Sequence, residues 1–285
     1  MNDKPSGTLT RFAPSPTGLL HLGHAYSALF AEALAKQAGG RFLLRIEDID
    51  PLRCMSEFET AIFEELTWLG LKWEQPVRRQ SDHMDTYASA LKRLEDMELL
   101  YPCFCSRKEI LTEIAAAGGA PQGPDGPHYP GICRGLSLDE AKARKQAGES
   151  FALRLDGNKA MAKVSGPLRW HDKGRGEITA RPEQFGDVVL ARKDIPTSYH
   201  LAVTIDDDLQ GVTLVSRGED LLPATDIHRL LQELLGLNVP TYHHHPLLND
   251  ETGRRLAKRD KAETIRALRE TGHTPQQVKE MTGLV

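Results

Sequence analysis

Apolar residues recur every three or four positions between residues 18 and 38, which is the spacing of one buried face of an α-helix. Residues 11–17 before it hold two prolines and must form an extended segment or turn, because proline disrupts a helix interior. Gly39 and Gly40 end the helix, and the mostly apolar run 41–46 suits a short buried strand. An extended segment, a helix and a buried strand in close succession predict a βαβ unit.

Further helices are predicted over residues 56–70, 84–99 and 225–235, each from apolar positions at helical spacing. Ser56 followed by Glu59 has the spacing of a capping box, which favours a helix start at that serine. Gly236 follows the last helix and indicates its end. These helices and the βαβ unit together predict the α/β fold class.

Short apolar runs at 151–155, 187–191, 199–205 and 212–215 predict strands in the second half of the chain. Before them lies a segment rich in glycine, proline and cysteine, which disfavours regular structure there. We therefore expect an α/β core interrupted by an inserted subdomain. The expected parts are a first half of the core at 8–100, the insertion at 101–190, a second half at 191–250, and a loop with a short helical tail at 251–285.

Composition narrows the class of protein only slightly. The chain of 285 residues has a formal net charge of −4, and 40% of its residues are hydrophobic, as in ordinary globular proteins. It has no uninterrupted apolar run of about 18 residues, which a membrane helix requires, and its first residues have no apolar core of the kind a signal peptide needs. We therefore expect a cytoplasmic, monomeric protein that does not bind membranes.

The segment 14–24 carries the first candidate site. His21 and His24 lie three residues apart where a loop becomes a helix, so their side chains share one face. Gly18 and Gly23 let a ligand approach the main chain, and a helix N-terminus attracts anions. The arrangement suits a nucleotide phosphate, although a pair of histidines at this spacing is more often a pair of capping or surface residues.

A basic segment later in the chain, RLAKR at residues 255–259, favours the phosphate site over a pair of capping or surface histidines. Alone it would indicate a solvated turn. Together with HLGH at 21–24 it resembles the paired HIGH and KMSKS signatures of class I aminoacyl-tRNA synthetases, which implies a Rossmann-type core that binds ATP. By this resemblance Lys258 joins His21 and His24 in catalysis and, with Gly23, in ATP binding; Ala257 departs from the signature and lacks the hydroxyl often found there.

Other segments narrow the resemblance to synthetases that activate glutamate. RFAPSPTG from Arg11, RIEDID from Arg45, Tyr199 and Arg217 resemble the glutamyl-tRNA synthetase catalytic domain. A glutamate side-chain carboxylate requires a fixed cation, which Arg11 or Arg217 could supply, and Glu47 suits the α-ammonium group. By resemblance the glutamate pocket comprises Arg11, Phe12, Ala13, Pro14, Ser15, Glu47, Tyr199 and Arg217.

Three of the four cysteines cluster in the sequence. Cys103, Cys105 and Cys133 supply three thiolates for a Zn²⁺ site that needs a fourth ligand. His128 is the better ligand on general chemistry, because imidazole is common at zinc and phenolate is rare. The pattern nevertheless resembles the small glutamyl-Q tRNA(Asp) synthetases, in which Tyr129 would take that place. Cys54 lies outside the cluster and is expected to be an inert thiol.

The short extent of the chain after residue 259 bears on which molecule accepts the activated glutamate. Residues 260–285 are too few for an independent domain, which needs about 50 residues, so we expect no anticodon-binding domain. This layout resembles the glutamyl-Q tRNA(Asp) synthetase family over nearly its whole length. The resemblance implies that glutamate is activated with ATP and Mg²⁺, without tRNA, and then transferred to queuosine at the wobble position of tRNA(Asp).

Two alternatives stay open at this point. One is a minimal glutamyl-tRNA synthetase that charges the 3′ end of a tRNA. The other is a catalytically silent, zinc-containing RNA-binding module. The acidic run at 206–208 could help to order the magnesium ion, although a solvated carboxylate cluster is the more ordinary interpretation.

Overall fold

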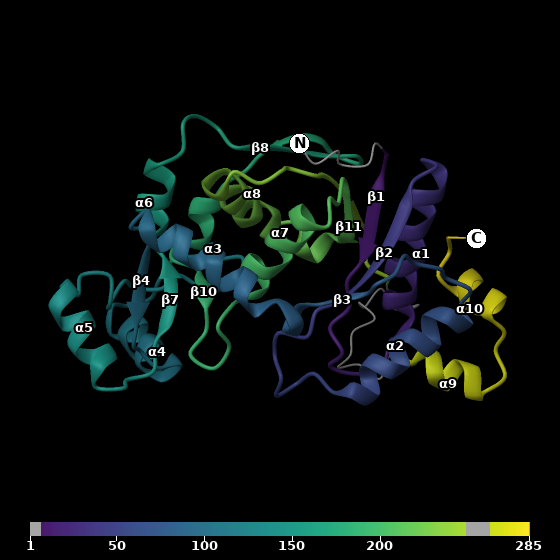
Figure 1. The fold of residues 1–285 in the computed structure, drawn as a ribbon, viewed down its shortest axis with the longest axis horizontal. Coiled ribbons are helices and arrows are strands. Elements are labelled where there is room, and N and C mark those ends of the chain that lie inside the picture. The colour runs from purple at the N-terminus through teal and green to yellow at the C-terminus, as the bar shows by residue number, and fades with distance from the viewer. Residues whose placement is uncertain (1–6, 249–262, 285) are drawn as a thin grey trace.

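The computed structural model describes residues 7–248 and 263–284. Its first part is the predicted βαβ unit, extended by one helix and one short strand (Figure 1). The elements are β1 (Leu9–Phe12), α1 (Leu22–Gln37), β2 (Arg41–Ile46), α2 (Ser56–Trp68) and β3 (Arg78–Arg79). The three strands pair in parallel in the order β1-β2-β3, with Leu9 opposite Arg41. The βαβ prediction is confirmed.

The second half of the core resumes beside β1. Its elements are α7 (Tyr199–Leu209), β11 (Leu214–Gly218), the 3₁₀ turn η3 (Glu219–Leu221), α8 (Ala224–Leu235) and β12 (Thr241–His245). The amide of Thr213 donates to the carbonyl of Leu9 (3.0 Å), which joins the start of β11 to β1. β11 and β12 pair in parallel, so the strands of both halves end at the same edge. Ligands of open α/β folds bind at such an edge, where the order of strands reverses.

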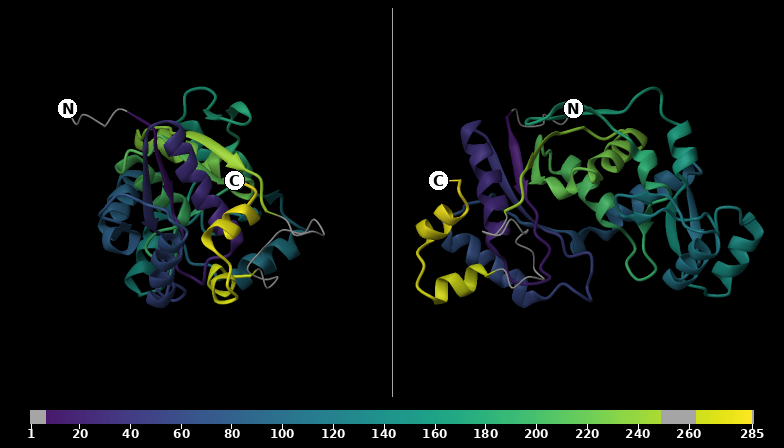
Figure 2. Two further views of the ribbon diagram at one scale, coloured as in Figure 1. Left: turned by 90° about the vertical axis from the view of Figure 1, so that its right-hand side faces the viewer. Right: turned by 180° about the vertical axis from the view of Figure 1, so that it is seen from behind.

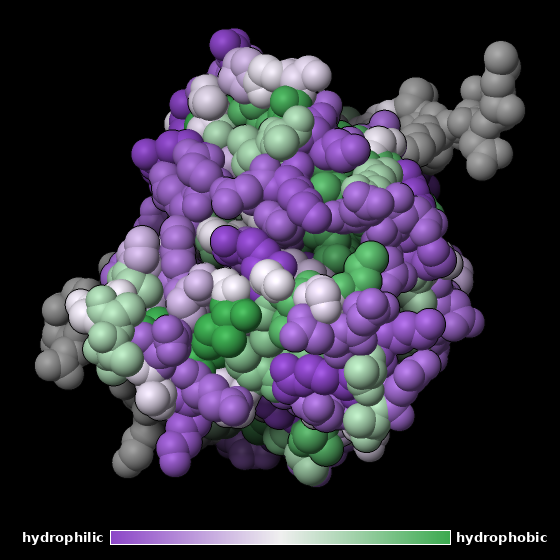
Figure 3. Space-filling view, turned by 90° about the vertical axis from the view of Figure 1, so that its left-hand side faces the viewer, coloured by the Kyte–Doolittle hydropathy of each residue, from purple (hydrophilic) through white to green (hydrophobic). Residues whose placement is uncertain are grey.

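The residues between the halves build a separate antiparallel sheet, at the left of Figure 1. β4 (Leu100–Cys103) and β10 (Val189–Ala191) flank β7 (Ala152–Leu155). The helices of this part are α4 (Arg107–Ala116), α5 (Leu138–Gln146) and α6 (Gly157–Ala162), and β5 (Gln122–Gly123) and β6 (Gly126–Pro127) form a hairpin. β8 (Arg169–Asp172) and β9 (Gly176–Thr179) instead form the outer strands beside β12. Hydrophilic residues predominate on this end of the molecule, and hydrophobic residues form scattered patches (Figure 3).

One α-helix and two short 3₁₀ helices connect these parts: α3 (Met84–Asp96), η1 (Gln80–His83) and η2 (Pro182–Phe185). One large apolar core runs under α3, α7 and α8 and continues to Leu155 and Leu190 of the antiparallel sheet. A second core lies between α1, α2 and the parallel sheet. The last described elements are α9 (Ile265–Glu270) and α10 (Pro275–Met281), which lie beside α1 and α2 (Figure 2). Their buried residues Ile265, Leu268 and Val278 join the second core. Both helices lie within the range predicted as a loop and a short helical tail.

Two local predictions were wrong. Residues 199–205 form most of α7 and not a strand. The prediction failed because this helix is buried on nearly every side, so its apolar residues form a continuous run and show no helical period. Ser56 is the first residue of α2 and not its cap: Met55 is the N-cap and makes no side-chain capping bond. The helix 225–235 is confirmed, with Gly236 in the left-handed conformation as its C-cap (φ 61°). No helix among the described residues is long and apolar enough to cross a membrane.

Candidate functional site

A cavity of about 510 Å³ opens at the carboxyl ends of the parallel strands. It brings together most of the predicted nucleotide and glutamate residues: Arg11, Phe12, Ala13, His21, Gly23, His24, Glu47, Tyr199 and Arg217. Pro14 and Ser15 do not line it; the carbonyl of Pro14 accepts from the amide of Glu47 (3.0 Å) and so holds that residue in place. Lys258 lies outside the described residues.

The two histidines cap the first turn of α1. His21 is the N-cap residue; its Nδ1 accepts from the amide of Gly23 (3.1 Å), and Nδ1 of His24 accepts from the amide of His21 (3.2 Å). The capping alternative and the phosphate interpretation are therefore compatible. Because each Nδ1 accepts a hydrogen bond, a neutral ring carries its proton on Nε2, which is then a donor. A Cβ on Gly23 would lie 3.1 Å from the His21 ring, so a small residue is needed here.

Arg11 and Arg45 are held by one buried carboxylate. Asp207 accepts from Arg11 Nε (2.9 Å) and Nη2 (3.3 Å), and from Arg45 Nη1 (2.8 Å). Burial alone would raise the pKa of Asp207, but the two guanidinium groups lower it. Arg45, which is fully buried, also donates to Glu47 (3.2 Å). Burial raises the pKa of Glu47 despite the opposing effects of Arg45 and Arg11.

Arg217 lies on β11 across the cavity, and most of its N–H donors already make hydrogen bonds within the protein. Its Nη1 donates to the Tyr199 hydroxyl (3.4 Å) and to His228 Nδ1 (3.3 Å). Its Nη2 donates to Thr225 Oγ1 (2.6 Å) and its Nε to His244 Nε2 (3.2 Å). Burial, followed by the charge of Arg217, lowers the pKa of His228 well below its usual value, so this ring is neutral and can accept.

The acidic run was interpreted wrongly. Asp206 is fully buried and accepts from Arg78 (2.8 Å), Gln80 (2.9 Å) and Tyr87 (2.8 Å), while Asp207 holds Arg11 and Arg45. Asp208 accepts from the amide of Asn238 (3.0 Å). Asp206 and Asp207 are therefore not solvated carboxylates, and they organise the core and the cavity, whereas Asp208 is partly exposed.

Asp207, Arg45, Thr225 and His244 are site residues that the sequence did not indicate. The only signal for Asp207 was its place in an acidic run, Arg45 opens the RIEDID segment but had no predicted role of its own, and Thr225 and His244 lie in no motif. Their roles come from contacts between different elements of the fold, which a local pattern does not contain.

A second cavity of about 620 Å³ lies next to the first. Tyr199 lines both cavities, and the wall of the second includes Asp50, Arg107, Arg192 and residues of the β5–β6 hairpin. Asp125 of that hairpin contacts His200 Nε2 (3.1 Å), and His200 Nδ1 contacts His228 (3.2 Å). A hydrogen-bonded path therefore leads from Arg217, through two histidines, to the rim of the second cavity.

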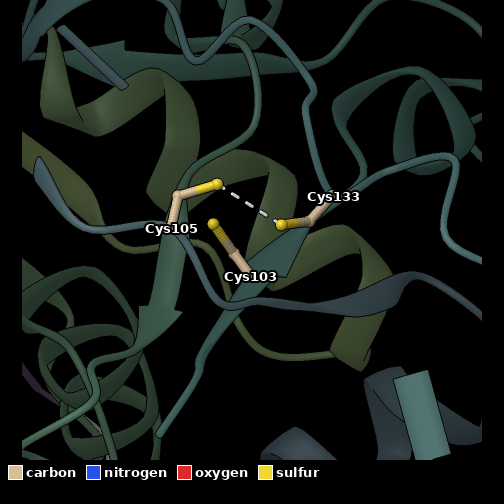
Figure 4. A group of neighbouring side chains, drawn as sticks. All are labelled: Cys103, Cys105 and Cys133. Carbon is tan, nitrogen blue, oxygen red and sulfur yellow. Dashed lines mark hydrogen bonds between the residues drawn. The ribbon is translucent and has the colours of Figure 1, made fainter. Parts of the chain in front are cut away.

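The clustered cysteines converge as predicted (Figure 4). The sulfur atoms of Cys103, Cys105 and Cys133 lie within 4.8 Å of one another, and those of Cys105 and Cys133 are 3.4 Å apart. Tetrahedral zinc with bonds of about 2.3 Å needs sulfur atoms about 3.8 Å apart, so the group fits such an ion with little adjustment. The Tyr129 hydroxyl lies 3.5 Å from Cys105 Sγ.

The two candidates for the fourth ligand differ in their surroundings. The Tyr129 ring lies beside the cysteines, and its hydroxyl accepts from the amide of Cys133 (2.8 Å). His128 instead contacts the carbonyl of Gln184 (2.6 Å). Burial raises the pKa of the Cys105 thiol to about 11, and for Cys133 hydrogen bonds overcome burial and lower the pKa. A cation would compensate the cost of burying such thiolates.

The fold and the cavity define a class of protein. The chain belongs to the family of class I tRNA synthetases for glutamate and glutamine, whose catalytic domain it matches over residues 8–285. It is therefore an enzyme of the ligase class. Within this family it is 49% identical to the glutamyl-Q tRNA(Asp) synthetase of Rhodobacter capsulatus, over 97% of this chain and 100% of that protein.

Other relatives share the catalytic part alone. The glutamate–tRNA ligase of Aquifex aeolicus is 39% identical over 94% of this chain but 54% of its own length. A crystal structure of the glutamate tRNA ligase from Elizabethkingia meningosepticum, in complex with its amino acid, superposes with a TM-score of 0.81 at 29% identity, over 97% of this chain. The chain spans 60% of that protein. The class I fold is thus confirmed.

Proposed function

We propose that the protein activates L-glutamate with ATP, without tRNA, and transfers it to the queuosine base at the wobble position of tRNA(Asp). The observation that carries the first step is the cavity that joins Arg11, Glu47 and Arg217 to the histidine-capped start of α1. Support for the second step comes from the match to a glutamyl-Q tRNA(Asp) synthetase along its entire length.

The reaction in the cavity is attack of the glutamate α-carboxylate on the α-phosphorus of ATP, which releases pyrophosphate. No protein nucleophile is needed, so the enzyme acts by positioning the two substrates and stabilising charge. The Nε2–H groups of His21 and His24 would donate to the phosphates, and the positive end of the α1 dipole would favour their negative charge. Lys258 would neutralise phosphate charge, and Mg²⁺ would accompany the triphosphate.

Glutamate would be held by the remaining donors of the two arginines. Among the contacts of the described residues, Arg11 retains one N–H on each Nη atom and Arg217 retains one on Nη2. Glu47, fixed by Arg45 and the carbonyl of Pro14, would accept from the α-ammonium group. Charge-assisted bonds of this kind are short and directional, which favours glutamate over neutral amino acids.

Residues 101–190 would form the inserted subdomain, and the second cavity would receive the acceptor. It adjoins the glutamate pocket at Tyr199, so a base held there could reach the adenylate carbonyl. Cys103, Cys105, Cys133 and Tyr129 would hold Zn²⁺, and the ion would cross-link the loop that contains β5 and β6. Modified single-stranded bases are commonly recognised in such protein pockets.

The test is transfer of radiolabelled glutamate to three RNAs: tRNA(Asp) with queuosine, tRNA(Asp) with guanosine at the wobble position, and tRNA(Glu). We expect glutamate-dependent pyrophosphate exchange without tRNA, and label only on the queuosine form. Label on tRNA(Glu) would instead establish a minimal charging synthetase. Absence of both exchange and transfer would contradict the proposal and leave an RNA-binding module.

A further inference from the structure

Arg217 is held by a buried support that extends away from the cavity. The residue is 6% exposed, and Nε donates to His244 Nε2 (3.2 Å) on the neighbouring strand β12. Thr225 Oγ1 accepts from Arg217 Nη2 (2.6 Å) and also lies 3.2 Å from His244 Nε2. Arg217, Thr225 and His244 therefore form one hydrogen-bonded unit beneath the proposed glutamate pocket.

A carboxylate on the next strand fixes the histidine. Asp172, at the end of β8, contacts His244 Nδ1 at 2.7 Å, and both side chains are fully buried. Asp172 itself accepts from the amides of His244 (3.0 Å) and Gly174 (2.8 Å). Each oxygen of Asp172 is thus bound by a main-chain donor, so the carboxylate has one orientation.

The protonation state of His244 follows from these neighbours. Burial, followed by the positive charge of Arg217, lowers the pKa of His244 to about 4, against the opposing effect of Asp172. The ring is neutral at neutral pH, with its proton on Nδ1 facing Asp172. Nε2 is then an acceptor, which is the only state that can receive the N–H of Arg217.

We propose that Asp172 and His244 are positioning residues: Asp172 selects the ring tautomer of His244, and the ring then orients the Arg217 guanidinium toward a substrate carboxylate. This inference rests on the proposed glutamate activation. Neither residue lines the cavity, so both would act only through Arg217.

Substitutions at His244 separate positioning from a merely structural role. In His244→Gln the amide oxygen can take the place of Nε2 and still accept from Arg217, whereas in His244→Asn the amide nitrogen can take the place of Nδ1 and still donate to Asp172. Asp172→Asn presents a donor where the main chain or the ring already donates, which favours the wrong tautomer. The matched control is His243→Gln, the adjacent residue on β12, which packs on Phe30.

The measurement is pyrophosphate exchange with separate KM values for glutamate and ATP. We expect the glutamate KM to rise about 10- to 100-fold in Asp172→Asn and His244→Asn, since a hydrogen bond to a charged group is lost, and less in His244→Gln. The ATP KM and the control should stay within about twofold of the wild type. Unchanged glutamate KM in the Asn variants, or His244→Asn outperforming His244→Gln, would overturn the inference.

If these variants do not fold, the glutamate KM values of Thr225→Val and Thr225→Ser test the inference instead. A raised glutamate KM in the valine variant that serine restores supports the buried unit, and equal KM values in both overturn it. Failure of the proposed function is a separate outcome, because it removes glutamate-dependent exchange from the wild type itself.

Discussion

Glu65 gives the sharpest prediction about stability. It lies on α2 facing α9 and is 3% exposed, and neither carboxylate oxygen has a hydrogen bond of ordinary geometry within the described part of the chain, although the main-chain amide of Leu20 lies close enough to lower the pKa of this carboxyl. Arg266 of α9 lies nearby, with its Nε 3.8 Å from Oε1. Burial is the main cause that raises the pKa of Glu65 to about 7. The perturbation is Glu65→Gln, which keeps the shape and removes the ionisation.

The magnitude follows from linkage between protonation and folding. A shift from 4.5 to about 7 corresponds to about 3 kcal/mol of stability that is present below pH 4.5 and lost as the pH rises through 7. The sign is set by the folded state, which binds the proton more tightly than the unfolded chain. Glu65→Gln should therefore stabilise by under about 1 kcal/mol at pH 5 and by about 3 kcal/mol at pH 8.5.

The assay is urea unfolding of wild type and variant at both pH values, followed by circular dichroism. The control is Glu64→Gln: this neighbour is exposed and 4.0 Å from the same arginine, so its replacement should change stability little at either pH. The reasoning is refuted if Glu65→Gln shifts the unfolding free energy equally at pH 5 and pH 8.5.

Three further predictions concern the two sites. Asp207→Ala should lower the unfolding free energy by about 3–5 kcal/mol and abolish exchange, because it leaves buried guanidinium groups without their carboxylate; denaturant unfolding and exchange check it. Cys133→Ser should lose bound zinc in elemental analysis of the purified protein while Cys54→Ser retains it, and equal zinc in both would contradict the site. Lys258→Ala should lower exchange at least about 10-fold while glutamate still binds in calorimetry, and unchanged exchange would remove the residue from the proposed mechanism.

The sequence predicted those features whose cause is local. The βαβ unit and the helix ended by Gly236 follow from short-range spacing, and the convergence of the cysteines follows from the number and type of metal-ligating residues in one segment. Helix α7 was mistaken for a strand because burial on all sides removes the amphipathic period.

The supports of the site escaped prediction for a different reason. Asp207 has a role only because it meets Arg11 from the other half of the chain, and Asp172 only because β8 lies beside β12. No residue near either aspartate in the sequence indicates such a partner. These contacts depend on which strands lie side by side in the fold, and a single sequence does not show that order.

The distance along the chain between Arg11 and Asp207 also governs when the protein can become active during its synthesis. The two residues are 196 positions apart. At about 5–20 residues per second, a ribosome needs about 10–40 s to reach Asp207 after adding Arg11. The βαβ unit can pack during that interval, but the first arginine of its pocket waits without its counter-charge. A nascent chain should therefore gain affinity for glutamate in one late step, when β11 emerges and closes against β1.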